Sequence, residues 1–174
     1  MGKLDVDTRP EPPSQGGEKE TLEGFLDFHR ATLLWKLSGL TDAELRQRLS
    51  PPTWPLLSLV KHLAYVERNW FRSRFIGEEL AVPWTEEDPD PDFRIEPGET
   101  TESVLAFYQD ECERSRAITA EASLDDLAVF WPADRDPSKR PTLRWILVHM
   151  IEETARHNGH ADIVREMIDG AAGE

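Results

Sequence analysis

The sequence predicts an all-α fold, a four-helix bundle with long loop connections, and three observations lead to this prediction. In four long segments, leucines and aromatic residues recur at steps of three and four, which is the spacing of one face of an α-helix. Prolines and glycines separate these segments, as they do where helices end. No extended alternation of apolar and polar residues, the pattern of a half-buried strand, runs through the 174 residues.

The first helix is expected over about residues 18–38, because six apolar residues share one face of it. These are Leu22, Phe25, Leu26, Leu33, Leu34 and Leu37. The segment LTDAELRQRL at 40–49 should begin a short helix, for which Thr41 or Asp42 can cap the first turn. The prolines of SPPTWP at 50–55 then break it.

The second long helix is expected to begin near Pro55 and to end at Gly77. Its apolar face is formed by Leu56, Leu59, Val60, Leu63, Val66, Trp70, Phe71 and Phe75. Residues 78–100 then form a long acidic loop with four prolines. We interpret this loop as a lid or wall over the open end of the bundle.

Four acidic residues of this loop follow the spacing of a calcium-binding loop. Asp88, Asp90, Asp92 and Glu99 stand at positions one, three, five and twelve of an EF-hand-like count. Position six is Phe93, however, where the turn of such a loop needs glycine. The sequence therefore disfavours a calcium site here.

The third helix is expected to start at Thr100 or Thr101 and to fade near Ala122. Its inward face is formed by Val104, Phe107, Tyr108, Cys112, Ser115 and Ile118. Cys112 is the only cysteine of the chain, and its place on this face favours a packing role over that of a nucleophile.

The fourth helix should follow a loop at 130–141, with Thr142 as its cap, and should run to Asp169. Gly170 is the expected left-handed stop. The inward stripe of this helix is Ile146, Met150, Glu153, His157, His160 or Ala161, Val164 and Ile168. Two of its members carry a carboxylate and an imidazole, although a bundle helix should be apolar on this face.

The overall composition indicates how the chain is divided, which partners are disfavoured and where the protein is expected. Residues 1–17 are rich in proline, glycine and charge, and we expect a disordered or loosely docked arm, followed by the bundle over 18–174. The net charge of −14 disfavours nucleic acid and an anionic membrane surface as partners. No apolar run is long enough to span a membrane, and the N-terminus lacks a signal-peptide pattern. A lone cysteine requires no oxidising compartment, so a cytoplasmic protein is expected.

Three residues on the inward faces could together hold a metal ion. Glu153 and His157 are four residues apart, so their side chains lie next to each other on one helix. His62, in SLVKHLAYVE of the second long helix, lies on or beside the buried face of that helix. Two histidines and one glutamate form a ligand set that leaves a coordination position open, as catalytic zinc sites do.

Other interpretations of these residues stay open at this stage. A single histidine on an apolar face is more often a packed core residue than a ligand, and Arg156 or Arg165 could neutralise Glu153. The remaining histidines, His29, His149 and His160, are ranked below the triad as alternative ligands or as residues that support the ligands.

Three stretches of the sequence resemble a known family. SLVKHLAYVERNWF (58–71) and HMIEETARHNGHADIVRE (149–166) resemble the signature helices of the DinB/YfiT-like family, a family of metal-binding four-helix bundles. GFLDFHRATLLWKLSGLTDAEL (24–45) resembles a mycothiol-transferase-like branch of that family. Glu153 departs from the histidine most common at its position. The set is instead similar to the His-Glu-His triad of the related mycothiol-dependent maleylpyruvate isomerases.

The resemblance implies a function for the expected site. It implies a divalent metal, zinc or nickel, held by His62, Glu153 and His157. It also implies a low-molecular-weight thiol such as mycothiol as cosubstrate, attacking an electrophilic small molecule, as in detoxification. The alternatives are a metal-assisted hydrolase, a non-enzymatic metal- or ligand-binding protein, and a helical interaction protein with structural histidines. The metal, the thiol, the electrophile and the formation of a homodimer all stay open.

Overall fold

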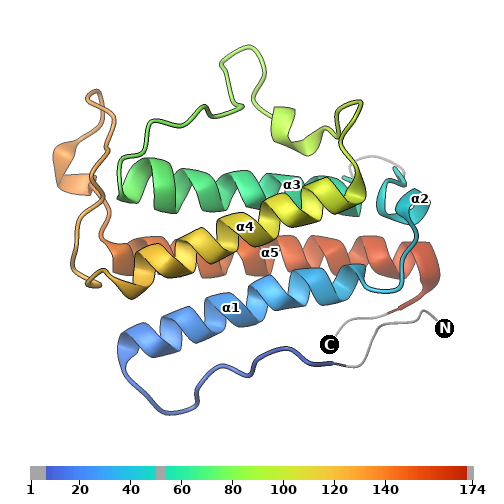
Figure 1. The fold of residues 1–174 in the computed structure, drawn as a ribbon, viewed down its shortest axis with the longest axis horizontal. Coiled ribbons are helices and arrows are strands. Elements are labelled where there is room, and N and C mark those ends of the chain that lie inside the picture. The colour runs from blue at the N-terminus through green and yellow to red at the C-terminus, as the bar shows by residue number, and fades with distance from the viewer. Residues whose placement is uncertain (1–6, 50–53, 172–174) are drawn as a thin grey trace.

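The computed structural model describes residues 7–49 and 54–171 of the chain. Its main elements are α1 (Glu18–Leu37), α3 (Leu56–Glu67) with its continuation η1 (Arg68–Phe75), α4 (Thr101–Ala120) and α5 (Leu143–Asp169). These helices lie side by side, and the segment between η1 and α4 arches over α3 (Figure 1). The predicted all-α bundle is confirmed, since the described residues contain only helices, loops and one isolated bridge, between Leu127 and Thr142.

Three short elements lie in the connections between the long helices. They are α2 (Asp42–Leu45) and the 3₁₀ turns η2 (Pro91–Phe93) and η3 (Pro137–Lys139). The short helix predicted within 40–49 is confirmed as α2, which is capped by Thr41 in a reciprocal arrangement with Glu44. Its predicted break over 50–55 lies partly outside the described residues.

The ends of the long helices follow the local signals in the sequence. The hydroxyl of Thr142 accepts a hydrogen bond from the backbone N–H of Trp145, which caps the start of α5. Gly170 ends α5 with a φ of 74°, in the left-handed region that suits glycine. Thr100 caps α4 together with Ser103.

The second long helix differs from the uninterrupted α-helix predicted between Pro55 and Gly77. Its regular α-helical part ends at Glu67, and the next eight residues, η1, continue as a π-helix, a wider turn with i→i+5 hydrogen bonds. In this turn Phe71 and Phe75 both point into the core. The apolar spacing of this stretch fits both periods, which explains why the pattern predicted an α-helix.

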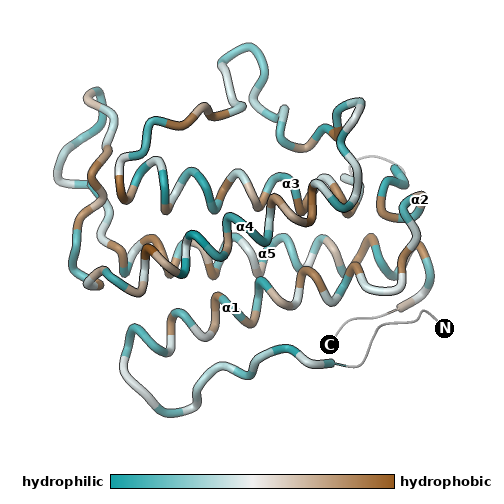
Figure 2. Tube along the Cα trace, in the orientation of Figure 1, coloured by the Kyte–Doolittle hydropathy of each residue, from teal (hydrophilic) through white to brown (hydrophobic). Residues whose placement is uncertain are grey.

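The apolar core forms two clusters along the inner faces of the helices, and the interior also contains buried charge. Figure 2 shows hydrophobic positions interspersed with polar ones along each long helix. The apolar core includes Leu33, Leu59, Leu63, Ile146, Leu147 and Met150, all at 0–1% exposure. No helix of the described part is both long enough and apolar enough to cross a membrane.

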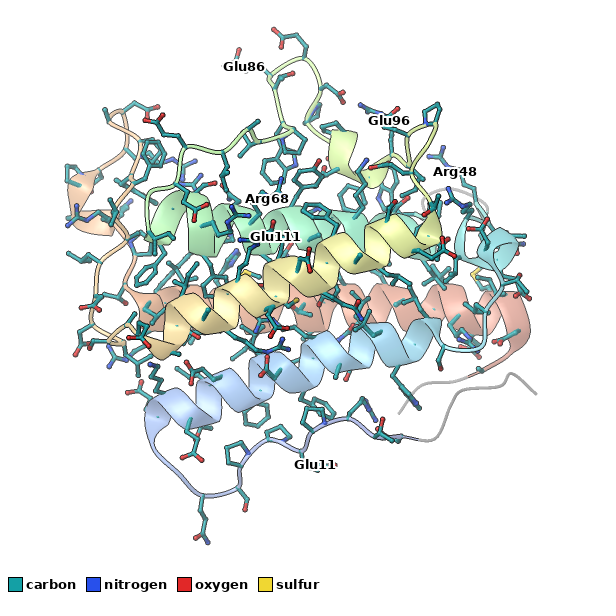
Figure 3. All side chains as sticks on the ribbon, in the orientation of Figure 1. Glu11, Arg48, Arg68, Glu86, Glu96 and Glu111 are labelled. Atoms are coloured by element: carbon teal, nitrogen blue, oxygen red, sulfur yellow. The ribbon has the colours of Figure 1, made fainter. Side chains whose placement is uncertain are left out.

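Two ion-pair clusters stabilise the contacts of η1 and α3 with their neighbours. The Arg30 guanidinium on α1 donates to both carboxylate oxygens of Glu67 on α3, at 2.8 and 2.6 Å. Both residues are buried. Arg68 and Arg72 on η1 bind the buried carboxylate of Glu111 on α4, and Figure 3 shows Arg68 next to Glu111. The buried carboxylates of Glu67 and Glu111 are thus paired with guanidinium groups, which offsets the cost of burying their charge.

The described part of the N-terminal arm, residues 7–17, runs along α1 (Figure 1). Arg9 donates a hydrogen bond to the Thr32 hydroxyl at 3.1 Å. Its guanidinium carbon lies 4.8 Å from the ring centre of Phe28 and 4.3 Å from that of Trp35. These contacts join the arm to one face of a helix that is already packed on α5.

We expect removal of residues 1–17 to cost little stability. The Arg9 side chain is 9% exposed, and a partly desolvated cation–π contact contributes about 1–2 kcal/mol. The loss should therefore lower the melting temperature by about 2–8 °C. Thermal unfolding of the truncated chain measures this, and Arg9→Ala in the full chain should reproduce most of the shift. A fall of more than 10 °C would show that the arm is part of the folding unit.

Candidate metal centre

The structure brings His62 of α3 together with Glu153 and His157 of α5. One ligand atom from each lies within 4.8 Å of the other two. Glu153 Oε1 is 3.4 Å from His62 Nε2 and 3.2 Å from His157 Nε2. The two imidazole rings lie 4.7 Å apart, centre to centre. Three potential ligands therefore converge on one point between two helices.

The local sequence explains why these side chains meet. Glu153 and His157 follow each other by one turn on the face of α5 that also buries Met150 and Ala161. His62 is one turn beyond Ser58 on α3, and α3 packs against α5. The faces along which α3 and α5 pack against each other thus also set the positions of His62, Glu153 and His157.

The surroundings of the triad fit a metal ion. The side chains of His62, Glu153 and His157 are 13%, 15% and 10% exposed, so the cluster is enclosed but not sealed. Nδ1 of His157 is buried and has no hydrogen-bond partner among the described residues. Two imidazole nitrogens and one carboxylate oxygen are donors that zinc and nickel accept.

Electrostatics in the metal-free cluster link the three groups. Hydrogen bonds from His157 and then His62 hold the pKa of Glu153 well below its ordinary value. Burial alone would lower the pKa of His62, but hydrogen bonds to Asp92 and Glu153 outweigh it, so the pKa of His62 is raised. Without a metal, the ionised carboxylate of Glu153 thus favours the protonated form of the neighbouring His62 imidazole.

Asp92 is a residue of the site that the sequence analysis did not identify. It lies on η2, is 1% exposed, and has Oδ2 2.6 Å from Nδ1 of His62. In the sequence, Asp92 stands out only as a member of the disfavoured calcium pattern, and Asp88 of that pattern pairs with Arg94 in the structure. Its only sequence signal was an aspartate between proline and phenylalanine in a polar loop, which identifies no partner.

The other three histidines lie outside the group of converging atoms. His149 stacks on Trp145 at 5.2 Å and meets Trp70 edge-on at 4.8 Å. His29 lies on α1 with its ring against Phe28, and burial lowers the pKa of both His29 and His149.

His160 follows the ligand pair but points outward. It is exposed and contacts the ring of His157 edge-on at 5.4 Å. Ala161 occupies the buried position on the inward stripe. Of the two residues that the sequence left open for this position, His160 and Ala161, the structure therefore selects Ala161.

The two arginines that could neutralise Glu153, Arg156 and Arg165, make few contacts with it. Arg165 binds Asp169 and the backbone carbonyls of Lys36 and Ser38. Arg156 reaches Glu153 only through Oε2, at 3.4 Å, and is otherwise paired with Glu152. Arg156 thus contacts Oε2 of Glu153, whereas the two histidines contact the other carboxylate oxygen, Oε1.

Cys112 lies in the core of α4, as its position on the inward face predicted. Burial, followed by the charge of Glu67, raises the pKa of its thiol to about 12. A thiol of this kind stays protonated at neutral pH and is a poor nucleophile. The packing interpretation of Cys112 therefore agrees with its surroundings.

A cavity of about 690 Å³ adjoins the triad through Phe93. The ring of Phe93 stacks on His62 at 4.2 Å and on Trp54 at 4.7 Å, and both Phe93 and Trp54 line the cavity. Arg48 and Glu96, which Figure 3 labels, also line it. The cavity is thus a space with an aromatic wall and charged surroundings, separated from the candidate ligands by one ring.

Comparison with known proteins adds the family. A crystal structure of a conserved protein from Enterococcus faecalis is similar over 88% of this chain and 98% of that one, with 17% identity and a TM-score of 0.53, which shows the fold alone. Among curated proteins, none matches the chain. The family model described as mycothiol-S-transferase matches residues 21–170, nearly the whole bundle. With this match the resemblance found in the sequence is confirmed, and the chain belongs to the mycothiol-S-transferase family.

Proposed function

We propose that this protein is a metal-dependent S-transferase that joins a low-molecular-weight thiol, mycothiol or a close relative, to an electrophilic small molecule. The observation that carries the proposal is the convergence of His62, Glu153 and His157 within 4.8 Å. Membership of the mycothiol-S-transferase family supports the choice of thiol. The electrophile is proposed only as a class, a small molecule with a carbon open to attack by sulfur.

His62, Glu153 and His157 are the residues that would hold the metal. A bound divalent cation supplies one kind of chemistry here, the deprotonation of a thiol that coordinates it at neutral pH. The three residues contribute one negative charge when both imidazoles are neutral. One positive charge is therefore left at the centre, which favours an anionic further ligand over a neutral one.

The chain's other residues would enclose and orient the thiol. The triad is only 10–15% exposed, so most water is excluded from it and electrostatic attraction there is stronger than in solvent. The cavity next to Phe93 could take the remainder of a polar cosubstrate, with Trp54 as a flat wall and Arg48 and Glu96 as polar contacts. Cys112 takes no part, because its buried thiol stays protonated.

The proposal is tested by thiol consumption. Metal-loaded protein is incubated with mycothiol and a generic alkylating electrophile, and the loss of free thiol is followed. We expect turnover by the wild type and by Glu152→Gln, a matched control on an exposed neighbouring residue, but not by Glu153→Gln. Equal rates with and without protein for every thiol tried would contradict the proposal. So would release of a hydrolysis product without thiol.

The stabilising effect of the metal should increase with pH. His62 holds its proton to a higher pH than a free imidazole because its pKa is raised, so its protonation stabilises the metal-free fold at low pH and this contribution is lost as pH rises through that pKa. The metal needs the neutral ring, so its affinity should rise about tenfold per pH unit below that pKa.

The corresponding measurement is the melting temperature with and without metal. A tenfold gain in affinity adds about 1.4 kcal/mol under saturating metal, so the shift caused by metal should be larger at pH 7 than at pH 6, by up to roughly 3–5 °C. His160→Ala should leave this trend unchanged, since that ring is exposed and outside the triad. A metal-induced shift that is equal at both pH values would contradict the assignment of His62.

A further inference from the structure

The connection between η1 and α4 places a buried carboxylate next to a candidate metal ligand. Asp92 Oδ2 lies 2.6 Å from Nδ1 of His62, on the side of the ring opposite Nε2, which faces Glu153. Asp92 is thirty residues from His62 in the chain and 1% exposed. The loop thus reaches the site with a charged group rather than merely covering it.

We infer that Asp92 is a positioning residue, which fixes the tautomer and the orientation of His62 for metal binding. An ionised carboxylate can only accept a hydrogen bond, so it requires the proton on Nδ1 of the neutral ring. Nε2 is then left with its lone pair directed at Glu153 and His157. This inference rests on the proposed metal site and adds a residue that acts on it through His62.

Three further contacts restrain His62 and the segment that carries Asp92. The Phe93 ring stacks on the His62 ring, with the planes 16° apart, so the imidazole cannot rotate freely. Lys61, the chain neighbour of His62, donates to the carbonyl of Arg94 at 2.7 Å and to the carboxylate of Glu99 at 2.8 Å. Residues 92–99 are therefore fastened to the same turn of α3 that carries the ligand.

The stability of the fold alone does not explain why a buried carboxylate is present at position 92. Its second oxygen, Oδ1, is buried and has no hydrogen-bond partner among the described residues. An unpaired buried polar atom costs free energy, and a smaller apolar residue would avoid that cost. The benefit must then come from the contact that Asp92 does make, and that contact is to Nδ1 of His62.

The first test compares Asp92→Asn with Asp90→Asn, a matched loss of charge on an exposed residue of the same loop. Dissociation constants for Zn²⁺ are measured by competition with a chelator, and the melting temperature of each metal-free variant is recorded. We expect Asp92→Asn to weaken binding about 10–100-fold and Asp90→Asn to stay within about twofold of the wild type. An affinity of folded Asp92→Asn equal to that of Asp90→Asn overturns the inference.

The second test needs no variant to fold. Long-range ¹H–¹⁵N correlation spectra of the metal-free wild type, recorded where His62 is neutral, report which ring nitrogen carries the proton. Protonated Nδ1 is expected, and an Nε2–H tautomer overturns the inference. A wild type that binds no Zn²⁺ at all would instead refute the proposed metal site, so the two failures are distinguishable.

Discussion

Arg30→Met should be the most destabilising single substitution that we predict for this protein. It leaves the carboxylate of Glu67 buried at 1% exposure without the guanidinium that binds both of its oxygens. Removing one partner of a buried ion pair costs about 3–5 kcal/mol. The expected fall in melting temperature is on the order of 10 °C, measured by calorimetry or circular dichroism.

Two further variants make this prediction specific. Arg116→Met removes an arginine that pairs with Asp27 at the surface, where the side chains are 46% and 32% exposed, and should cost about 1 kcal/mol or less. Arg30→Met combined with Glu67→Leu should recover much of the lost stability, because an apolar pair can replace a buried ion pair. Equal melting temperatures for Arg30→Met and Arg116→Met would show that the buried pair is unimportant.

His157→Ala should have the largest effect on activity. The substitution removes one of three ligand atoms and leaves a site of two residues, which holds a metal poorly. A metal ion that stabilises developing charge contributes several kcal/mol to a reaction barrier, so the rate of thiol transfer should fall on the order of 10³-fold. The rate is measured with metal at a fixed free concentration, together with metal content per chain.

His160→Ala is the matched control for this experiment. It lies on the same helix, touches His157 edge-on and is exposed, so its loss should change the rate less than about threefold. A comparable loss of rate in both variants would indicate a general effect on α5 and not the loss of a ligand. Metal-free melting curves of both variants separate the two cases.

The helices and the triad could be predicted because their signals are local and periodic. Thr142 and Gly170 bound α5 through capping chemistry within a few residues. Glu153 and His157 were identified because they break an apolar stripe, and His62 because it lies on another stripe that faces the same interior. Packing the stripes of two helices together brings these residues into contact without further information.

The π-helix and the long-range ion pairs could not be predicted in this way. Apolar positions around Phe71 fit a period of either 3.6 or about 4.4 residues, so periodicity does not distinguish an α-helix from a π-helix here. In the structure, the wider turn occurs together with the tertiary contacts of Arg68 and Arg72 with Glu111. Arg30 and Glu67 are two among many charged residues, and nothing in their neighbourhoods identifies them as partners. Such pairs depend on how helices cross, which periodicity does not specify.

Asp92 shows the same limit for loops. Its contact with His62 requires the path of residues 78–91 and the anchoring of the following segment by Lys61, neither of which has a sequence pattern. The spacing of its acidic neighbours pointed instead to a calcium loop, which the phenylalanine at the glycine position argued against. The loop was expected to form a lid or wall over the open end of the bundle. The structure shows it arching over α3 with η2 packed against that helix, and the contribution of Asp92 to the site became visible only there.

The central claim is that His62, Glu153 and His157 hold one divalent metal with a position left for a thiol. Titration of the cobalt-substituted protein with mycothiol, followed by absorption spectroscopy, tests this claim most directly. The account predicts one cobalt ion per chain and a new sulfur-to-cobalt charge-transfer band that saturates at one thiol per metal. A protein that retains far less than one cobalt ion, or a spectrum that mycothiol leaves unchanged, would contradict it.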